Sequence, residues 1–144
     1  CEMNEISNSA KQQYSEAKFP RQNLPEMNES RIKPPIIQHQ IIEIFLAKTF
    51  QYRDCHILEL GMKFCKDLDL TILDTLSHGF KPYGITALFV LSESHCAIHY
   101  WPENYYLHID LVTCRKEEIA LDELGSKIKK IFSVETINIY NIKY

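Results

Sequence analysis

Residues 91–114 hold the densest set of side chains in this sequence that can do nucleophilic, acid–base or metal-binding chemistry. His95 and His99 lie four positions apart, so a strand of period two places both on one face. The next predicted strand sends Asp110 and Cys114 to a single face as well. Antiparallel pairing across the short turn between these strands would bring the two sets together.

Two interpretations of this segment come from the residue types alone. The first is structural: the imidazoles and the thiol have their hydrogen-bond partners inside a sheet. This is the default interpretation for any single histidine. The second is a zinc site made by His95, His99 and Cys114. An i, i+4 histidine pair suits ligation on a helix, whereas Pro102 and the β-rich context favour a strand. No second ligand pair supports zinc, so we expect no metal.

A third interpretation begins at the tripeptide Glu93-Ser94-His95. Here the sequence resembles the prokaryotic-type S-adenosylmethionine decarboxylases, a family of self-processing, pyruvoyl-dependent enzymes. Their Glu-Ser-His cleavage site is preceded by His-x-Phe-x-Pro-x-Gly-Val-Ser/Thr and followed by Ile-His-x-Trp-Pro-Glu and Asp-x-x-Thr-Cys. The matching segments of this chain are 78–86, 93–95, 98–103 and 110–114. The resemblance covers about residues 38–142, and linked motifs at matching spacing are far more specific than Glu-Ser-His alone.

The resemblance implies that the chain cuts itself between Glu93 and Ser94, into residues 1–93 and 94–144. The Ser94 hydroxyl would attack the Glu93 carbonyl, and β-elimination would then leave a pyruvoyl group derived from Ser94. A serine is a poor nucleophile at its free pKa, so this step needs an adjacent base and a strained peptide. His99 would be the processing base that removes the Ser94 α-proton. Thr86 would stabilise the oxyanion intermediate through its hydroxyl.

For catalysis, the resemblance implies that the pyruvoyl carbonyl forms a Schiff base with the substrate amine and accepts the electrons released with CO2. Cys114 would be the proton donor to the resulting carbanion. The adenine of S-adenosylmethionine would lie between Phe80 and Trp101, and Glu103 would bind the ribose hydroxyls. The product, decarboxylated S-adenosylmethionine, serves polyamine (spermidine) synthesis. The expected assembly is a homodimer of processed units with shared active sites.

Three features, at four positions, depart from the family pattern and bear on the substrate. Tyr100 replaces the usual threonine, Arg115 replaces the usual glycine, and Asn104-Tyr105 changes the turn beside the ribose site. Arg115 is expected to be an exposed charge at a strand end, with pairing to a substrate carboxylate as the less favoured reading. One alternative is therefore a relative that decarboxylates ornithine, arginine or a similar amino acid. Another is a non-catalytic regulatory paralogue, which would lack Ser94, His99 or Cys114, yet all three are present.

The elements that position these residues follow from hydrophobic periodicity. Strands are expected at 40–46, 70–76, 85–91, 105–114 and 134–142, and strand character resumes over 95–101 after the segment 85–91. Helices are expected from an Asp54 cap to Leu68 and over 121–131. We give the order as strand, helix, three strands, helix, strand. The expected fold is α+β, a two-layer sandwich with both helices on one face of a mainly antiparallel sheet.

Composition bounds the remaining possibilities. The 144 residues carry 16 Lys and Arg against 19 Asp and Glu, a net charge of −3, which gives no overall drive toward nucleic acid or an anionic membrane. Residues 1–36 are polar and proline-containing, so we expect a flexible arm before a domain at 37–144. The five cysteines are odd in number and widely spaced, which favours reduced thiols. With no leader-like segment at the start, we expect a cytoplasmic protein.

Overall fold

The computed structural model of the chain describes residues 33–49 and 51–144. Residues 36–144 form one compact unit. Nearly all of the expected flexible arm, 1–36, lies outside the described residues. The division into an arm and a domain at 37–144 therefore stays a prediction.

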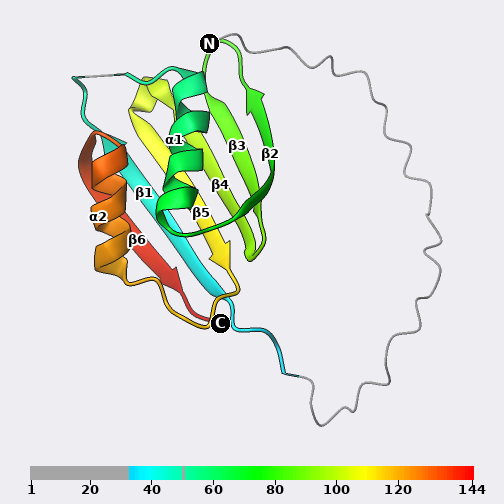
Figure 1. Ribbon diagram of the computed structural model, residues 1–144. Helices are drawn as coiled ribbons and strands as arrows, with labels where there is room; N and C mark the ends of the chain where they lie inside the picture. The colour runs from blue at the N-terminus through cyan, green and yellow to red at the C-terminus, as the bar shows by residue number, and fades with distance from the viewer. Residues whose placement is uncertain (1–32, 50) are drawn as a thin grey trace, which may run out of the picture. The chain divides into compact units, whose positions relative to one another are not determined.

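The framework is one antiparallel sheet of six strands in the order β2-β3-β4-β5-β1-β6 (Figure 1). The strands are β1 (Gln38–Leu46), β2 (Ile72–Gly79), β3 (Ile85–Leu91), β4 (Ser94–Trp101), β5 (Tyr106–Thr113) and β6 (Val134–Ile142). In β5 the buried residues alternate with half-buried ones, as the period-two pattern of Leu107, Ile109 and Leu111 predicts. The buried side chains of the central strands point to one face and form the core there.

Both helices, α1 (Asp54–Asp67) and α2 (Leu121–Ile131), cover that same face, so the predicted α+β sandwich is confirmed (Figure 1). The predicted element order is wrong by one strand, because four strands separate the helices. The reason lies at residues 91–95, which we read as an interruption of strand character. In the structure they form a tight hairpin turn that makes β3 and β4 two separate, paired strands.

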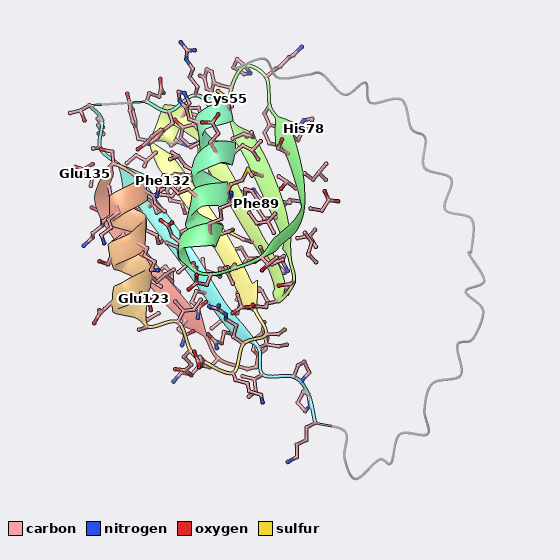
Figure 2. All side chains as sticks on the ribbon, in the orientation of Figure 1. Cys55, His78, Phe89, Glu123, Phe132 and Glu135 are labelled. Atoms are coloured by element: carbon pink, nitrogen blue, oxygen red, sulfur yellow. The ribbon has the colours of Figure 1, made fainter. Side chains whose placement is uncertain are left out.

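Helix α1 positions the core side of β3 and β4. Its buried residues include Ile57 and Phe64, as the helical spacing predicts, and Phe89 projects from β3 beneath it (Figure 2). The predicted cap at Asp54 is wrong by one position, because Arg53 is the N-cap residue and Asp54 is the first helical residue. An aspartate in the first turn still interacts favourably with the positive end of the helix dipole.

The cysteine and membrane expectations have different outcomes. Cys65, Cys96 and Cys114 are free thiols, whereas the expectation of a reduced thiol is wrong at Cys55, which is disulfide-bonded. Among the described residues, neither helix has the length and apolar character that a bilayer crossing requires. The cytoplasmic compartment stays a prediction.

Gly61 offers a direct test of how tightly α1 packs on the sheet. A Cβ at Gly61 would lie 2.8 Å from Ile98 Cδ1 and from two atoms of the Phe89 ring, whereas one at Gly125 in α2 would lie 3.7 Å from Ile139 Cδ1. In a helix interior, alanine stabilises the folded state by about 0.5–1 kcal/mol relative to glycine. We expect Gly125→Ala to raise the free energy of unfolding by about that amount. Gly61→Ala should lower it by about 1–3 kcal/mol through overpacking.

Urea unfolding of the two variants and the parent protein measures this difference. Gly125→Ala is the matched control, since both substitutions replace a helical glycine. Equal stabilisation by both variants would contradict the close approach of α1 to β3 and β4.

Candidate active site

The turn between β3 and β4 contains the predicted cleavage site and a strained backbone. Leu91 pairs with Ser94, so Ser92 and Glu93 alone form the turn. Ser94 has a φ of 135°, a value that L-residues other than glycine rarely adopt. Such a conformation costs about 1–3 kcal/mol and persists only where the surrounding structure imposes it. The strain lies directly at the Glu93–Ser94 peptide.

The end of β5 holds this turn in place. The backbone N–H of Cys114 donates a hydrogen bond of 2.8 Å to the Glu93 carbonyl oxygen, the carbonyl that self-cleavage requires to be attacked. Ser94 lies opposite Thr113 in the β4–β5 register. The Thr113 hydroxyl is buried and has no hydrogen-bond partner among the described residues. Glu93, Ser94 and Cys114 are therefore gathered at one end of the sheet, next to a hydroxyl still free to bind a new polar group.

A chain of polar groups leads away from the Ser94 hydroxyl across the face of the sheet opposite the helices. Ser94 Oγ lies 3.4 Å from His95 Nδ1, and His95 Nε2 lies 3.9 Å from Asp110 Oδ2. Asp110 Oδ1 lies 2.5 Å from His39 Nε2, and His39 Nδ1 lies 3.1 Å from the Tyr144 hydroxyl. The expected meeting of the His95 face with Asp110 is confirmed. Sequence reasoning missed His39, whose signal is only its place in β1, the strand that pairs with β5.

Arg115 is engaged on the cleavage turn. Its Nε lies 2.7 Å from Glu93 Oε2, and its two terminal nitrogens donate to the carbonyl oxygens of Leu68 and Asp69 at 3.1 and 3.2 Å. Its side chain is 26% exposed. The expectation of an exposed strand-end charge is therefore wrong, and pairing of Arg115 with a substrate carboxylate stays a prediction.

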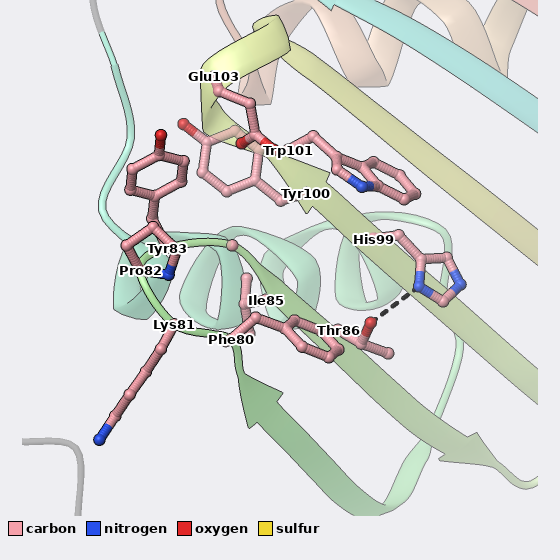
Figure 3. A pocket seen from close by; sticks show the side chains of 11 residues that line it. Phe80, Lys81, Pro82, Tyr83, Ile85, Thr86, His99, Tyr100, Trp101 and Glu103 are labelled. Carbon is pink, nitrogen blue, oxygen red and sulfur yellow. Dashed lines mark hydrogen bonds between the residues drawn. The ribbon is translucent and has the colours of Figure 1, made fainter.

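A second group of predicted residues lies in a cleft of about 580 Å³ at the other end of β4 (Figure 3). Phe80 enters it from the β2–β3 connection, and Trp101 and Glu103 enter from the end of β4 and the following 3-10 turn, η2 (Pro102–Asn104). Phe80 and Trp101 are 51% and 40% exposed, so two aromatic faces are open to a ligand. Gly84 closes the connection with a φ of 103°, and the Phe80 amide donates to its carbonyl oxygen at 2.8 Å.

Thr86 and His99 form a hydrogen-bonded pair on the wall of this cleft. Thr86 Oγ1 lies 2.9 Å from His99 Nδ1 (Figure 3). Partial burial, and then the neighbouring His108, lower the pKa of His99 below its ordinary value, while Asp110 opposes the shift. The lowered pKa favours the neutral His99 ring, which has one unprotonated nitrogen available as a base.

One departure from the family pattern lines this cleft, and another follows it at the end of the η2 turn. Tyr100 contributes to the cleft wall, but its side chain is buried and its hydroxyl donates to the Tyr52 carbonyl oxygen at 3.0 Å. Burial raises the pKa of Tyr100 to about 12, so the phenol stays neutral. Tyr105 ends the η2 turn with a φ of 50°, in the left-handed region.

The structure does not bring all the predicted catalytic residues together. Ser94 pairs with Thr113, whereas His99 pairs with Thr86 and His108, five residues farther along β4. At about 3.3 Å per strand residue, the backbones of Ser94 and His99 lie about 17 Å apart. His95 and His99 are about 13 Å apart by the same measure. One zinc ion cannot reach both, and no cluster of metal ligands occurs among the described residues.

Comparison with known proteins gives a consistent result. The family model described as S-adenosylmethionine decarboxylase matches residues 38–143. A Prochlorococcus marinus (strain MIT 9313) protein named S-adenosylmethionine decarboxylase proenzyme is 42% identical over 98 residues, which are 62% of this chain and 78% of that protein. A protein of the same name from Clostridium botulinum (strain Loch Maree / Type A3) is 37% identical over 79 residues, 54% of this chain and 68% of that one.

Among solved structures, the adenosylmethionine decarboxylase of Aquifex aeolicus VF5 has the same fold. It superposes with a TM-score of 0.64 at 22% identity, covering 76% of this chain and 91% of that one. The family match spans all six strands and both helices and contains both clusters of residues described above. The chain is thus a member of the S-adenosylmethionine decarboxylase family.

Proposed function

We propose that this chain cuts itself between Glu93 and Ser94 and then, through the resulting pyruvoyl group, decarboxylates S-adenosylmethionine for polyamine synthesis. The single observation that carries the proposal is the strained Ser94, whose preceding carbonyl accepts the Cys114 N–H at 2.8 Å. A donor already aimed at that oxygen stabilises negative charge that develops there when the carbonyl is attacked.

In the first step, Ser94 Oγ attacks the carbonyl carbon of Glu93. The peptide C–N bond breaks, and the hydroxyl proton passes to the released Ser94 nitrogen, which leaves an ester. His95 is the group placed to relay this proton, since its Nδ1 lies 3.4 Å from Ser94 Oγ. Asp110 Oδ2, 3.9 Å from the other ring nitrogen, is placed to orient the ring in the way a carboxylate orients a catalytic histidine.

In the second step, a base removes the Ser94 α-proton. The main-chain carboxylate of Glu93 leaves from the ester, the chain is cut, and water displaces ammonia from the dehydroalanine to give the pyruvoyl end. His99 fits the role of base in the tautomer whose Nδ1–H donates to Thr86 Oγ1, which leaves Nε2 unprotonated. The Thr86 hydroxyl proton is then free to stabilise an oxyanion.

The residues present around Ser94 fit a pyruvoyl group formed there. Once formed there, the pyruvoyl group would supply a carbonyl that withdraws electrons as CO2 leaves the substrate. Cys114, exposed at the end of β5 beside the cleavage site, would hold the proton that the substrate carbon needs. Phe80 and Trp101 would bind the adenine and attract the sulfonium cation with their aromatic faces, and Glu103 would accept hydrogen bonds from the ribose.

The active unit in this proposal is a homodimer, because one chain holds the two halves of the site about 17 Å apart. Among the described residues, no helix covers the second face of the sheet, which carries exposed apolar side chains at Leu88, Val90 and Trp101. Two such faces pack about 10 Å apart. A twofold axis between them, crossing β4 at its middle, would set the partner subunit's His99 over Ser94.

Ser94→Ala tests the proposed function. We expect the variant to remain one uncut chain with no decarboxylase activity, because it lacks both the nucleophile and the source of the pyruvoyl group. The parent protein should release CO2 from S-adenosylmethionine and not from ornithine or arginine. Gel analysis and release of labelled CO2 measure both. Activity on a free amino acid alone would contradict the proposed substrate, and cutting of Ser94→Ala would contradict the nucleophile.

Cys114→Ala separates self-cleavage from turnover. The backbone N–H that contacts Glu93 remains in this variant, so we expect the chain to be cut. Turnover of S-adenosylmethionine per cut chain should fall by about 10²-fold or more, as for loss of a general acid. Cys65→Ala is a control for removal of a thiol from the buried core. Unchanged turnover in Cys114→Ala would rule out its role as proton donor.

Mixing two inactive variants tests the shared site. Ser94→Ala keeps His99, and His99→Ala keeps Ser94, so coexpression creates mixed dimers with one complete site. We expect the His99→Ala chains to be cut in the mixture and to remain largely uncut alone. Differently tagged chains, followed by mass spectrometry, show which chain is cut. No cutting in mixed dimers that are shown to form would place both residues in the same chain's site.

A further inference from the structure

Arg115 makes contacts that the proposed reaction does not yet use. All three guanidinium nitrogens are engaged, with Nε on the Glu93 carboxylate and the other two on the carbonyl oxygens of Leu68 and Asp69. We propose that Arg115 is a positioning residue that holds Glu93 for self-cleavage by tying the cleavage turn to the end of α1. This inference rests on the proposed self-processing and adds to it a group that holds the side chain of the residue bearing the reacting carbonyl.

The backbone that carries Arg115 is itself fixed. Gln38, at the start of β1, is 7% exposed and donates from Nε2 to the carbonyl oxygens of Arg115 and Glu117 at 3.0 and 2.8 Å. Its Oε1 accepts the amide N–H of Ile119 at 3.2 Å. A buried amide that satisfies three backbone groups sets residues 115–119 as a rigid loop. The arginine side chain therefore extends from a fixed point.

The far end of the arginine is also fixed. Leu68 and Asp69 follow α1, where carbonyl oxygens are left without helical partners and the helix dipole is negative. A guanidinium group donates in several directions within one plane, so it can satisfy these carbonyls and still present Nε to Glu93. A lysine ammonium is a point charge on a flexible stem and cannot hold the same three partners in one geometry.

These contacts restrain Glu93 at two places. The Cys114 N–H holds its main-chain oxygen at 2.8 Å, and Arg115 holds its carboxylate at 2.7 Å. Glu93 Oε2 is buried, so without Arg115 this charge would be drawn toward water and the turn would move with it. The Ser94 strain would then relax, and the carbonyl would leave the orientation in which Oγ attacks it. Small losses of alignment between reacting atoms slow a reaction strongly.

The rate of self-cleavage in newly made chains tests this proposal. Full-length chains are made by cell-free synthesis, translation is stopped, and samples are denatured at intervals to measure the cut fraction. We expect Arg115→Met and Arg115→Lys to be cut about tenfold more slowly than the parent, because loss of the ion pair to Glu93 misaligns the reacting carbonyl. Lys116→Met, at an exposed neighbouring charge, is the matched control and should be cut at the parent rate.

Chemical rescue separates positioning from a general loss of structure. Ethylguanidinium should speed the cutting of Arg115→Ala and leave the parent unchanged, whereas tetraethylammonium at the same concentration should not. Parent-like cutting by Arg115→Met and Arg115→Lys would overturn the proposal, as would slow cutting that ethylguanidinium does not restore. Failure of the parent chain itself to be cut would instead contradict the proposed function.

Discussion

The hydrogen bond from the Cys114 amide to the Glu93 carbonyl is the contact on which the cleavage site depends. It exists because β4 pairs with β3 on one side and β5 on the other, so Ser94 lies opposite both Leu91 and Thr113. With both neighbours fixed, the two-residue turn has no freedom to relax, and the positive φ falls on Ser94. The helices serve this arrangement indirectly, since their packing on the other face keeps the three strands in register.

The sheet also explains why the site is divided. A strand separates residues by about 3.3 Å each, so motif residues five positions apart cannot meet on the same strand. The cleft with Phe80, Trp101 and the Thr86–His99 pair lies at one end of β4, and the cleavage turn lies at the other. In the proposed homodimer, a second copy stacked on the open face would reconcile this spacing with chemistry that needs both ends. The exposed aromatic side chains would then serve both ligand binding and assembly.

Local patterns in the sequence predicted both helices and most of the strands, and they selected Ser94 and Cys114 at one end of β4 and the cleft residues at the other. They did not predict that β3 and β4 are separate strands. Alternation predicted the buried side of β5, and helical spacing predicted the core residues of α1. Contacts between distant segments were beyond such reasoning. His39 reaches Asp110 only because β1 inserts between β5 and β6. The contacts of Arg115 could not be predicted from local patterns, because its partners, Leu68 and Asp69, lie 47 and 46 residues away along the chain.

If the chain itself breaks the Glu93–Ser94 peptide, the mass spectrum of the purified parent protein will show it. We expect two fragments, 1–93 and 94–144, with the second lighter by one ammonia than a fragment that begins with serine. That fragment should also lack a free amino terminus. A single uncut chain, or a second fragment that still begins with serine, would contradict the account.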